Sequence, residues 1–188
     1  MWAGRRQSSA ERRQRRAGID DPQLVLDAAA RFLEVRPRSI AEVRRRLTGA
    51  GYRTDLVDGA IDRLSELGML DDRAFAEAWI ASRDRARPRG EHAIRRELLE
   101  KGIARDLVGD LLEARRGSNR GLPGDPDLDA ATRLLERNAG SLGRVADPRV
   151  RRQRAYALLA RNGFDPETCG TAARAWLAEA AEEPGAEA

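Results

Sequence analysis

The sequence contains very few of the residues that carry most protein chemistry. Cys169 is its only cysteine and His92 its only histidine, and aromatic residues make up 4% of the 188 positions. A single cysteine excludes an internal disulfide scaffold. The chain also has no apolar stretch of about 18 residues and no charged-then-apolar leader. We therefore predict neither a membrane span nor a secretory signal, and we expect a cytoplasmic protein.

Motifs for catalysis, cofactors and metals are also missing. The sequence has no Walker-type phosphate loop, no dinucleotide fingerprint and no G-x-S-x-G motif. His92 has no cysteine or carboxylate at ligand spacing, so we expect it on the surface, and we expect Cys169 to be a small apolar filler. Asp71 and Asp72 precede an apolar helix and are more typical of a helix cap than of a metal pair. We predict no catalytic residues, no metal, no cofactor and no enzymatic activity.

What the sequence does contain is a repeated block. Residues 36–39 read Arg-Pro-Arg-Ser, and residues 87–90, at an offset of 51, read Arg-Pro-Arg-Gly. Gly51 and Gly102 are separated by the same offset, and each follows a leucine by four positions. This is the pattern of a helix that ends at a left-handed glycine. A weaker third copy ends at Gly163. A constant offset of this size predicts a repeated structural unit.

Apolar positions at helical spacing divide each unit into three helices. Asp21 with Pro22 begins the first helix, Ser39 with Glu42 forms a capping box for the second, and Thr54 or Asp55 is expected to cap the third. No segment alternates at period two over a useful length. Because 35% of the residues are charged, the core must be thin, which favours repeats that touch only their neighbours. We predict an all-α, elongated tandem array of three-helix repeats with about nine helices and no sheet.

Composition also sets the predicted boundaries. The first 20 residues are rich in arginine and lack apolar periodicity, whereas glycine, proline and aspartate accumulate after the second unit. The predicted segments are a disordered basic arm at 1–20, repeats at 21–67 and 68–116, a linker at 117–128, a third repeat at 129–180 with a glycine-rich break at 140–143, and a disordered acidic tail at 181–188.

Positive charge is clustered in the repeats. The formal net charge is +4, and Lys101 is the only lysine among 35 basic residues. The preference for arginine over lysine fits a codon bias and says nothing about ligands. Seven arginines against two acids in residues 31–53, and six against two in residues 83–96, are more informative. These clusters either contact a polyanion or an acidic protein surface, or form solvated helix faces. For the basic arm, binding a polyanion and simply aiding solubility remain alternatives.

Several of these segments together resemble the RecX family, the modulators of the bacterial RecA recombinase. The resemblance lies in residues 68–76 (Gly-Met-Leu-Asp-Asp-Arg-Ala-Phe-Ala), in the block at 87–90, and in the stretch from Ile94 to the Lys-Gly-Ile turn at 101–103. It implies an all-α protein of tandem three-helix repeats without enzymatic activity. It also implies binding in the groove of the RecA–single-stranded-DNA filament, where such proteins suppress filament growth, ATP hydrolysis and strand exchange.

This resemblance and the charge pattern together suggest which residues meet a partner. Guanidinium groups can bind either acidic side chains or DNA phosphates. The candidate partner- or DNA-binding residues are Arg36, Arg38, Arg44, Arg45, Arg46, Arg87, Arg89, Arg95, Arg96 and Lys101. The expected partners are the RecA filament and single-stranded DNA, with the chain acting as a monomer. The alternative is a helical protein that binds DNA directly, without a recombinase, since three-helix units resemble helix-turn-helix folds.

Overall fold

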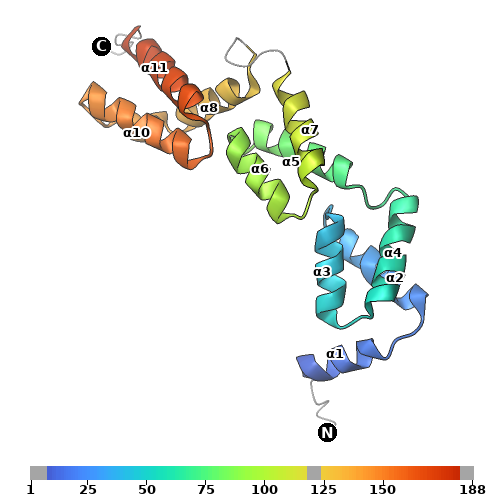
Figure 1. Cartoon of the computed structure of the whole chain (residues 1–188). Coiled ribbons are helices and arrows are strands. Elements are labelled where there is room, and N and C mark those ends of the chain that lie inside the picture. Colours follow the sequence, from blue (N-terminus) through green and yellow to red (C-terminus); the bar gives the residue numbers. More distant parts are fainter. Residues whose placement is uncertain (1–7, 118–123, 183–188) are drawn as a thin grey trace. The chain divides into compact units, whose positions relative to one another are not determined.

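The computed structural model describes residues 8–117 and 124–182, and this part of the chain is helical with no strand. The prediction of an all-α protein without a sheet is confirmed (Figure 1). None of the described helices is long and apolar enough to cross a bilayer. The helices are α1 (Ser9–Ala17), α2 (Pro22–Leu33), α3 (Ile40–Ala50), α4 (Thr54–Glu66), α5 (Asp72–Arg85), α6 (Glu91–Glu100), α7 (Arg105–Arg116), α8 (Pro126–Arg137), α9 (Ala139–Gly143), α10 (Pro148–Arg161) and α11 (Pro166–Glu182).

The chain divides into two compact units. Within the described residues, unit 1 contains residues 8–75 and 101–103, and unit 2 contains residues 76–100, 104–117 and 124–182. The boundary falls in the first turn of α5.

The core of unit 1 is built by α2, α3 and α4. Val25, Val43 and Val57, one from each helix, are fully buried together. The caps of the first two helices are as predicted: Asp21 accepts a hydrogen bond from the Gln23 N–H at 2.9 Å, and the capping box at the start of α3 is complete. These local signals are enough to begin each helix where its apolar stripe begins.

The predicted cap of α4 is wrong. The N-cap is Arg53, which makes no side-chain cap, and Thr54 and Asp55 lie inside the first turn. Asp55 instead forms an ion pair with Arg53 at 2.6 Å. Because the N-cap residue is an arginine, whose side chain has no acceptor atom, the helix begins without a side-chain cap.

The expectation of a disordered arm at residues 1–20 is contradicted over α1. Ser8 and Glu11 form a reciprocal capping box at its start. The helix has no buried residue, so it lacks the apolar periodicity on which the prediction depended. It is held instead by the end of α3: the Arg16 guanidinium donates to the Ala50 carbonyl at 3.4 Å and lies 5.6 Å from the centre of the Tyr52 ring.

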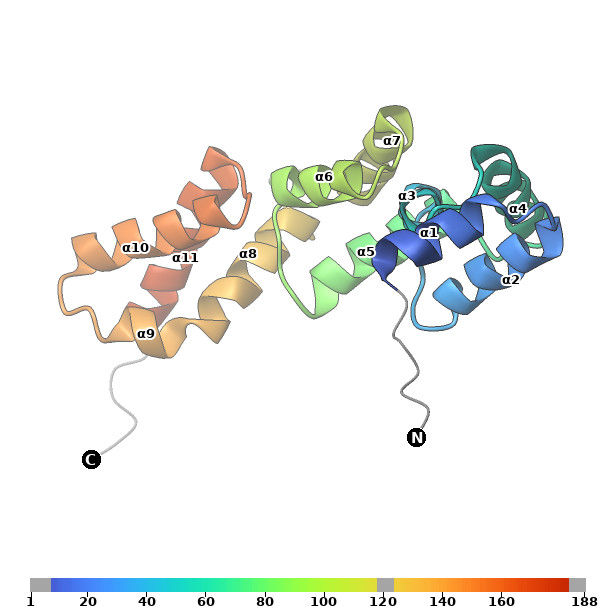
Figure 2. The same ribbon diagram turned by 90° about the horizontal axis from the view of Figure 1, so that it is seen from below.

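Unit 2 contains the helices of two further bundles. α5 is tied to α6 and α7 by side chains: the Trp79 indole donates to Glu97 at 2.8 Å, and Arg115 pairs with Asp84 at 2.7 Å. α8, α10 and α11 surround a separate core that includes Leu135, Leu159 and the buried Cys169. Figure 2 shows α10 and α11 side by side. The described residues thus contain eleven helices, more than the nine or so predicted.

The ends of the third bundle differ from the predicted boundaries. α8 begins at Pro126, inside the predicted linker, because Asp125 caps it by accepting from the Asp127 N–H at 2.8 Å. The predicted glycine-rich break is the single-turn helix α9, anchored by the buried Leu142. α11 ends at Glu182, two residues into the predicted tail. The rest of that tail and the middle of the linker lie outside the described residues.

In both units, the start of the second helix in a repeat donates to a carbonyl and to a carboxylate from later in the chain. In unit 1, the Ser39 hydroxyl donates to the Lys101 carbonyl at 2.6 Å, and the Ile40 N–H donates to the Asp72 carboxylate at 2.9 Å. In unit 2, the positions 51 residues later do likewise. The Gly90 N–H donates to the Asn162 carbonyl at 3.1 Å, and the Glu91 N–H donates to the Asp127 carboxylate at 3.0 Å. Each of these helix starts is thus completed by groups from further along the chain.

The glycines that end the second helices are needed for these contacts. Gly102 and Gly163 have φ values of 83° and 84°, which favour glycine. A Cβ atom on Gly102 would also lie 2.3 Å from the Ala41 Cβ, and one on Gly163 would lie 2.5 Å from the Ala93 backbone nitrogen. The repeated glycine therefore serves both the helix stop and the close approach of the next segment.

Candidate polyanion-binding surface

An arginine-lined hollow lies in unit 1 where α1 meets the C-terminal end of α3. Figure 1 shows α1 next to this end of α3. We call it the arginine hollow. None of the described residues that line it carries a carboxylate. Its lining residues are Ser9, Ala10, Arg12, Arg13, Arg16, Arg45, Arg46, Gly49 and Ala50.

The end of α3 explains why arginines gather here. The last carbonyls of a helix have no partner within the helix and carry partial negative charge. Arg16 satisfies one of them at Ala50. Gly51, with φ of 103°, lets Arg13 approach so closely that a Cβ atom on this glycine would lie 2.5 Å from the Arg13 carbonyl oxygen. Backbone geometry therefore brings α1 to this place.

Two arginines stack on Phe32 of α2, and one of them, Arg46, also lines the hollow. The guanidinium carbon of Arg38 is 4.1 Å from the centre of the Phe32 ring, and that of Arg46 is 5.7 Å from it. These distances are typical of cation–π contacts. Burial and the neighbouring Arg36 lower the pKa of Arg38 from its ordinary value, and its Nε finds no hydrogen-bond partner among the described residues.

Two of the predicted binding residues are held by Glu42. The carboxylate accepts from Arg36 at 3.0 Å and from Lys101 at 3.0 Å, and its side chain is only 12% exposed. Burial raises the pKa of Glu42, but the hydrogen bonds from Arg36, Lys101 and the Ser39 backbone outweigh this effect and hold the pKa at about 2. Arg36 and Lys101 therefore balance an internal charge in this structure.

Acid is expected to weaken unit 1 through Glu42. The pKa of this carboxyl in the folded chain, about 2, lies below its ordinary value of 4.5, so its stabilisation is complete above pH ~4.5 and is lost as the pH falls toward 2. Because the side chain retains some contact with water, we expect a loss of about 1–2 kcal/mol in the free energy of unfolding. Urea titrations followed by circular dichroism measure it. Glu42→Gln should flatten this pH dependence, whereas Glu66→Gln, at an exposed carboxylate, should leave it unchanged.

The other predicted arginines are mostly in local ion pairs. In unit 1, Arg44 pairs with Asp58. In unit 2, Arg95 pairs with Glu91 at 3.1 Å, Arg96 lies 3.9 Å from Glu100, and Arg89 bonds to Asn162. Arg87 is exposed. The predicted set is thus divided between the two units, and only Arg45 and Arg46 line the arginine hollow.

Three residues of the hollow were missed by sequence reasoning. Arg12, Arg13 and Arg16 belong to the segment predicted as a disordered arm. A signal was present: Ser8 and Glu11 have the spacing of a capping box. With a helix starting there, arginines four positions apart fall on one face.

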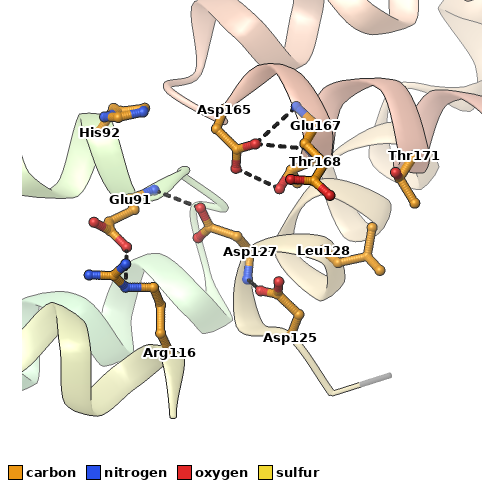
Figure 3. A pocket seen from close by; sticks show the side chains of 10 residues that line it. All are labelled: Glu91, His92, Arg116, Asp125, Asp127, Leu128, Asp165, Glu167, Thr168 and Thr171. Atoms are coloured by element: carbon orange, nitrogen blue, oxygen red, sulfur yellow. Dashed lines mark hydrogen bonds and ion pairs between the residues drawn. The ribbon is translucent and has the colours of Figure 1, made fainter. Parts of the chain in front are cut away.

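Five carboxylates of unit 2 line a polar joint (Figure 3). Four of them accept a hydrogen bond or form an ion pair, namely Glu91, Asp125, Asp127 and Asp165. Asp165 accepts from the Glu167 N–H at 2.9 Å, Asp125 caps α8, and Glu91 pairs with Arg116 at 2.9 Å. No group of three or more metal-binding side chains suited to an ion occurs in the described part of the chain. The joint therefore connects helices and shows no reacting group.

The single cysteine and histidine lie as the sequence predicted. Cys169 is fully buried, and its thiol lies 3.6 Å from the Phe164 carbonyl. Burial, with a smaller effect from Asp165, raises the pKa of Cys169 to about 11. Because the thiolate is the reactive form, this thiol is chemically quiet near neutral pH. His92 is exposed at the start of α6.

Known proteins share this sequence and fold. Residues 26–64 match the model of the first three-helix domain of RecX, and residues 71–112 match that of the second. A "Regulatory protein RecX" from Chlorobium phaeobacteroides (strain BS1) is 32% identical over 77% of this chain and 88% of its own length. One from Mycolicibacterium smegmatis (strain ATCC 700084 / mc(2)155) is 39% identical over 44% of each chain.

Solved structures agree on the fold. The crystal structure of RecX from Lactobacillus salivarius superimposes with a TM-score of 0.69, at 20% identity, over 83% of this chain and 96% of that one. At that identity, the structural similarity shows a shared fold, whereas the similarity in sequence to the relatives above shows the family. On the strength of the sequence relatives and the domain models, this chain belongs to the RecX family of regulatory proteins.

Proposed function

We propose that this protein binds the RecA–single-stranded-DNA filament and restrains its growth, ATP hydrolysis and strand exchange, and thereby modulates recombination and DNA repair. It acts by occupancy and carries out no catalysis. Membership of the RecX family makes a regulatory role the starting point, and the arginine hollow is the observation that supports a polyanionic partner.

The chemistry of the hollow fits a surface that combines protein and nucleic acid. Five guanidinium groups from two helices line it, and none of the described residues that line it is acidic. Planar guanidinium forks bind phosphates and carboxylates in the same bidentate way. A filament presents both groups at regular spacing, so contacts from several repeats of one chain can reinforce one another.

Binding to filament and to bare DNA can be compared directly. The full chain, labelled with a fluorophore, is titrated with single-stranded DNA and with the same DNA coated by RecA in the presence of a slowly hydrolysed ATP analogue. We expect the chain to bind the filament at least about tenfold more tightly than bare single-stranded DNA, a difference of about 1.4 kcal/mol in binding free energy. Equal affinity for both would instead support the alternative of a helical protein that acts on DNA without a recombinase.

A further inference from the structure

A second hollow without carboxylates lies in unit 2, between α10 and α11. We call it the tyrosine hollow. It belongs to the third bundle, outside the residues matched by the RecX domain models. Its lining residues are Arg149, Arg152, Gln153, Tyr156, Gly170, Ala173 and Arg174.

The side chains of the tyrosine hollow come from two facing helices. Arg149, Arg152 and Tyr156 are three and four positions apart and share one face of α10. Arg174 comes from α11. The same helix supplies Gly170, where an added Cβ atom would meet nothing within 4 Å. A tyrosine and three arginines thus line a hollow with open space above this glycine.

The ring of Tyr156 is available to a flat ligand. The residue is 38% exposed, which is unusual for a large aromatic side chain on a helix that also contributes to a core. It does not belong to the buried cluster formed by α8, α10 and α11. Packing within the bundle therefore does not account for its position.

Within the described part of the chain, the three arginines of the tyrosine hollow lack the ion pairs that several other arginines form. Arg36, Arg44 and Arg95 each form an ion pair with a nearby acid. By contrast, no carboxylate of the described residues pairs with Arg149, Arg152 or Arg174. The one polar contact from Arg174 is to the Thr171 hydroxyl at 3.5 Å, and α10 carries no acidic residue. Three positive charges are left without internal compensation.

We propose that the tyrosine hollow binds single-stranded nucleic acid, with phosphates on Arg149, Arg152 and Arg174 and a base stacked on Tyr156. Proteins that bind single strands combine a positive track for the backbone with aromatic side chains for the bases. An acidic peptide would use the arginines but has no flat group for the ring. A duplex keeps its bases stacked inside, away from such a ring. The site requires no recombinase and so goes beyond the function proposed above.

The test uses the full chain and a fluorescein-labelled oligo-dT, with binding followed by anisotropy. Stacking on an aromatic side chain contributes about 1–3 kcal/mol per base, so Tyr156→Ala should weaken binding by about 5- to 100-fold. Tyr156→Phe keeps the ring and should bind as the natural chain does. An unchanged dissociation constant in Tyr156→Ala, with an unchanged thermal melt, would overturn the proposal.

Two further comparisons distinguish the contribution of the arginine charges to binding from that of base stacking. Arg152→Gln with Arg174→Gln should weaken binding and lower its salt dependence more than the matched control Arg63→Gln with Arg105→Gln, which removes the same charge from other helices. An abasic strand of equal length should bind the natural chain and Tyr156→Ala equally weakly. If the abasic strand binds the natural chain as tightly as oligo-dT, the hollow is a plain polyanion site and the stacking proposal is wrong. Because no recombinase is present, these results are independent of filament regulation.

Discussion

Replacing Arg115 with methionine is expected to lower the free energy of unfolding by about 3–5 kcal/mol. The guanidinium is only 5% exposed and lies between two carboxylates, 2.7 Å from Asp84 and 2.6 Å from Asp127. Methionine fills much of the space but leaves both acids without their cation. The cost of an uncompensated buried charge exceeds the worth of the ion pair itself. Urea unfolding followed by circular dichroism measures the change.

A pH series and a rescue variant make this prediction specific. Burial raises the pKa of Asp127 even with Arg115 beside it. Without Arg115 this pKa should rise further, so the loss of stability should shrink as the pH falls and Asp127 becomes protonated. Adding Asp127→Asn to Arg115→Met should restore part of the stability, because an amide oxygen still accepts from the Glu91 N–H. Arg105→Met, at an exposed position, is the control. If Arg115→Met costs no more than Arg105→Met, the ion-pair account of the joint is wrong.

The second large effect is expected from Gly90→Ala. A Cβ atom on Gly90 would lie 2.3 Å from the Gly163 carbonyl oxygen. The backbone must then separate, and the Gly90 and His92 N–H bonds to residues 162 and 163, now 3.1 and 3.2 Å, would be lost. We expect a destabilisation of about 2–4 kcal/mol from overpacking and unsatisfied backbone groups.

Gly109 provides the matched control for that substitution. It lies within α7, and an added Cβ atom there would meet nothing within 4 Å. Gly109→Ala should therefore raise stability by about 0.5–1 kcal/mol, as expected for a glycine inside a helix. Differential scanning calorimetry of the two variants compares them directly. A similar small gain in both would contradict the close approach described for Gly90.

Helices whose signals are local were predicted well from the sequence. The Asp-Pro pair before α2, the capping box before α3 and the glycine after it act within a few residues. Asp125 with Pro126 carries the same signal as the pair before α2, but it was assigned to a linker because of the glycine and proline around it. α1 was missed because it buries no residue, so its helix leaves no apolar stripe in the sequence.

The candidate surface was harder to predict because tertiary contacts decide which charged side chains form ion pairs within the fold and which line the hollow. Glu42 takes up the charge of Lys101, which is 59 positions away in the sequence. No local pattern shows that this lysine is engaged while Arg45 and Arg46 line a hollow. The arginines of α10 can be read from the sequence, but their relation to Tyr156 and Gly170 depends on how α11 packs beside them. The clustering of arginines therefore predicts a positively charged surface, but the packing of the helices decides which residues belong to it.

The most direct test of the central claim is the rate of ATP hydrolysis by RecA on single-stranded DNA as this protein is added. We predict that the natural chain lowers the rate, and that Arg45→Gln with Arg46→Gln raises the concentration needed for half-inhibition about tenfold or more, as expected when charge-assisted contacts worth about 1.4 kcal/mol or more are lost. The charge-matched Arg63→Gln with Arg105→Gln should inhibit as the natural chain does. Equal inhibition by both pairs, with folding intact, would contradict the assignment of the arginine hollow. No inhibition by the natural chain would contradict the proposed function itself.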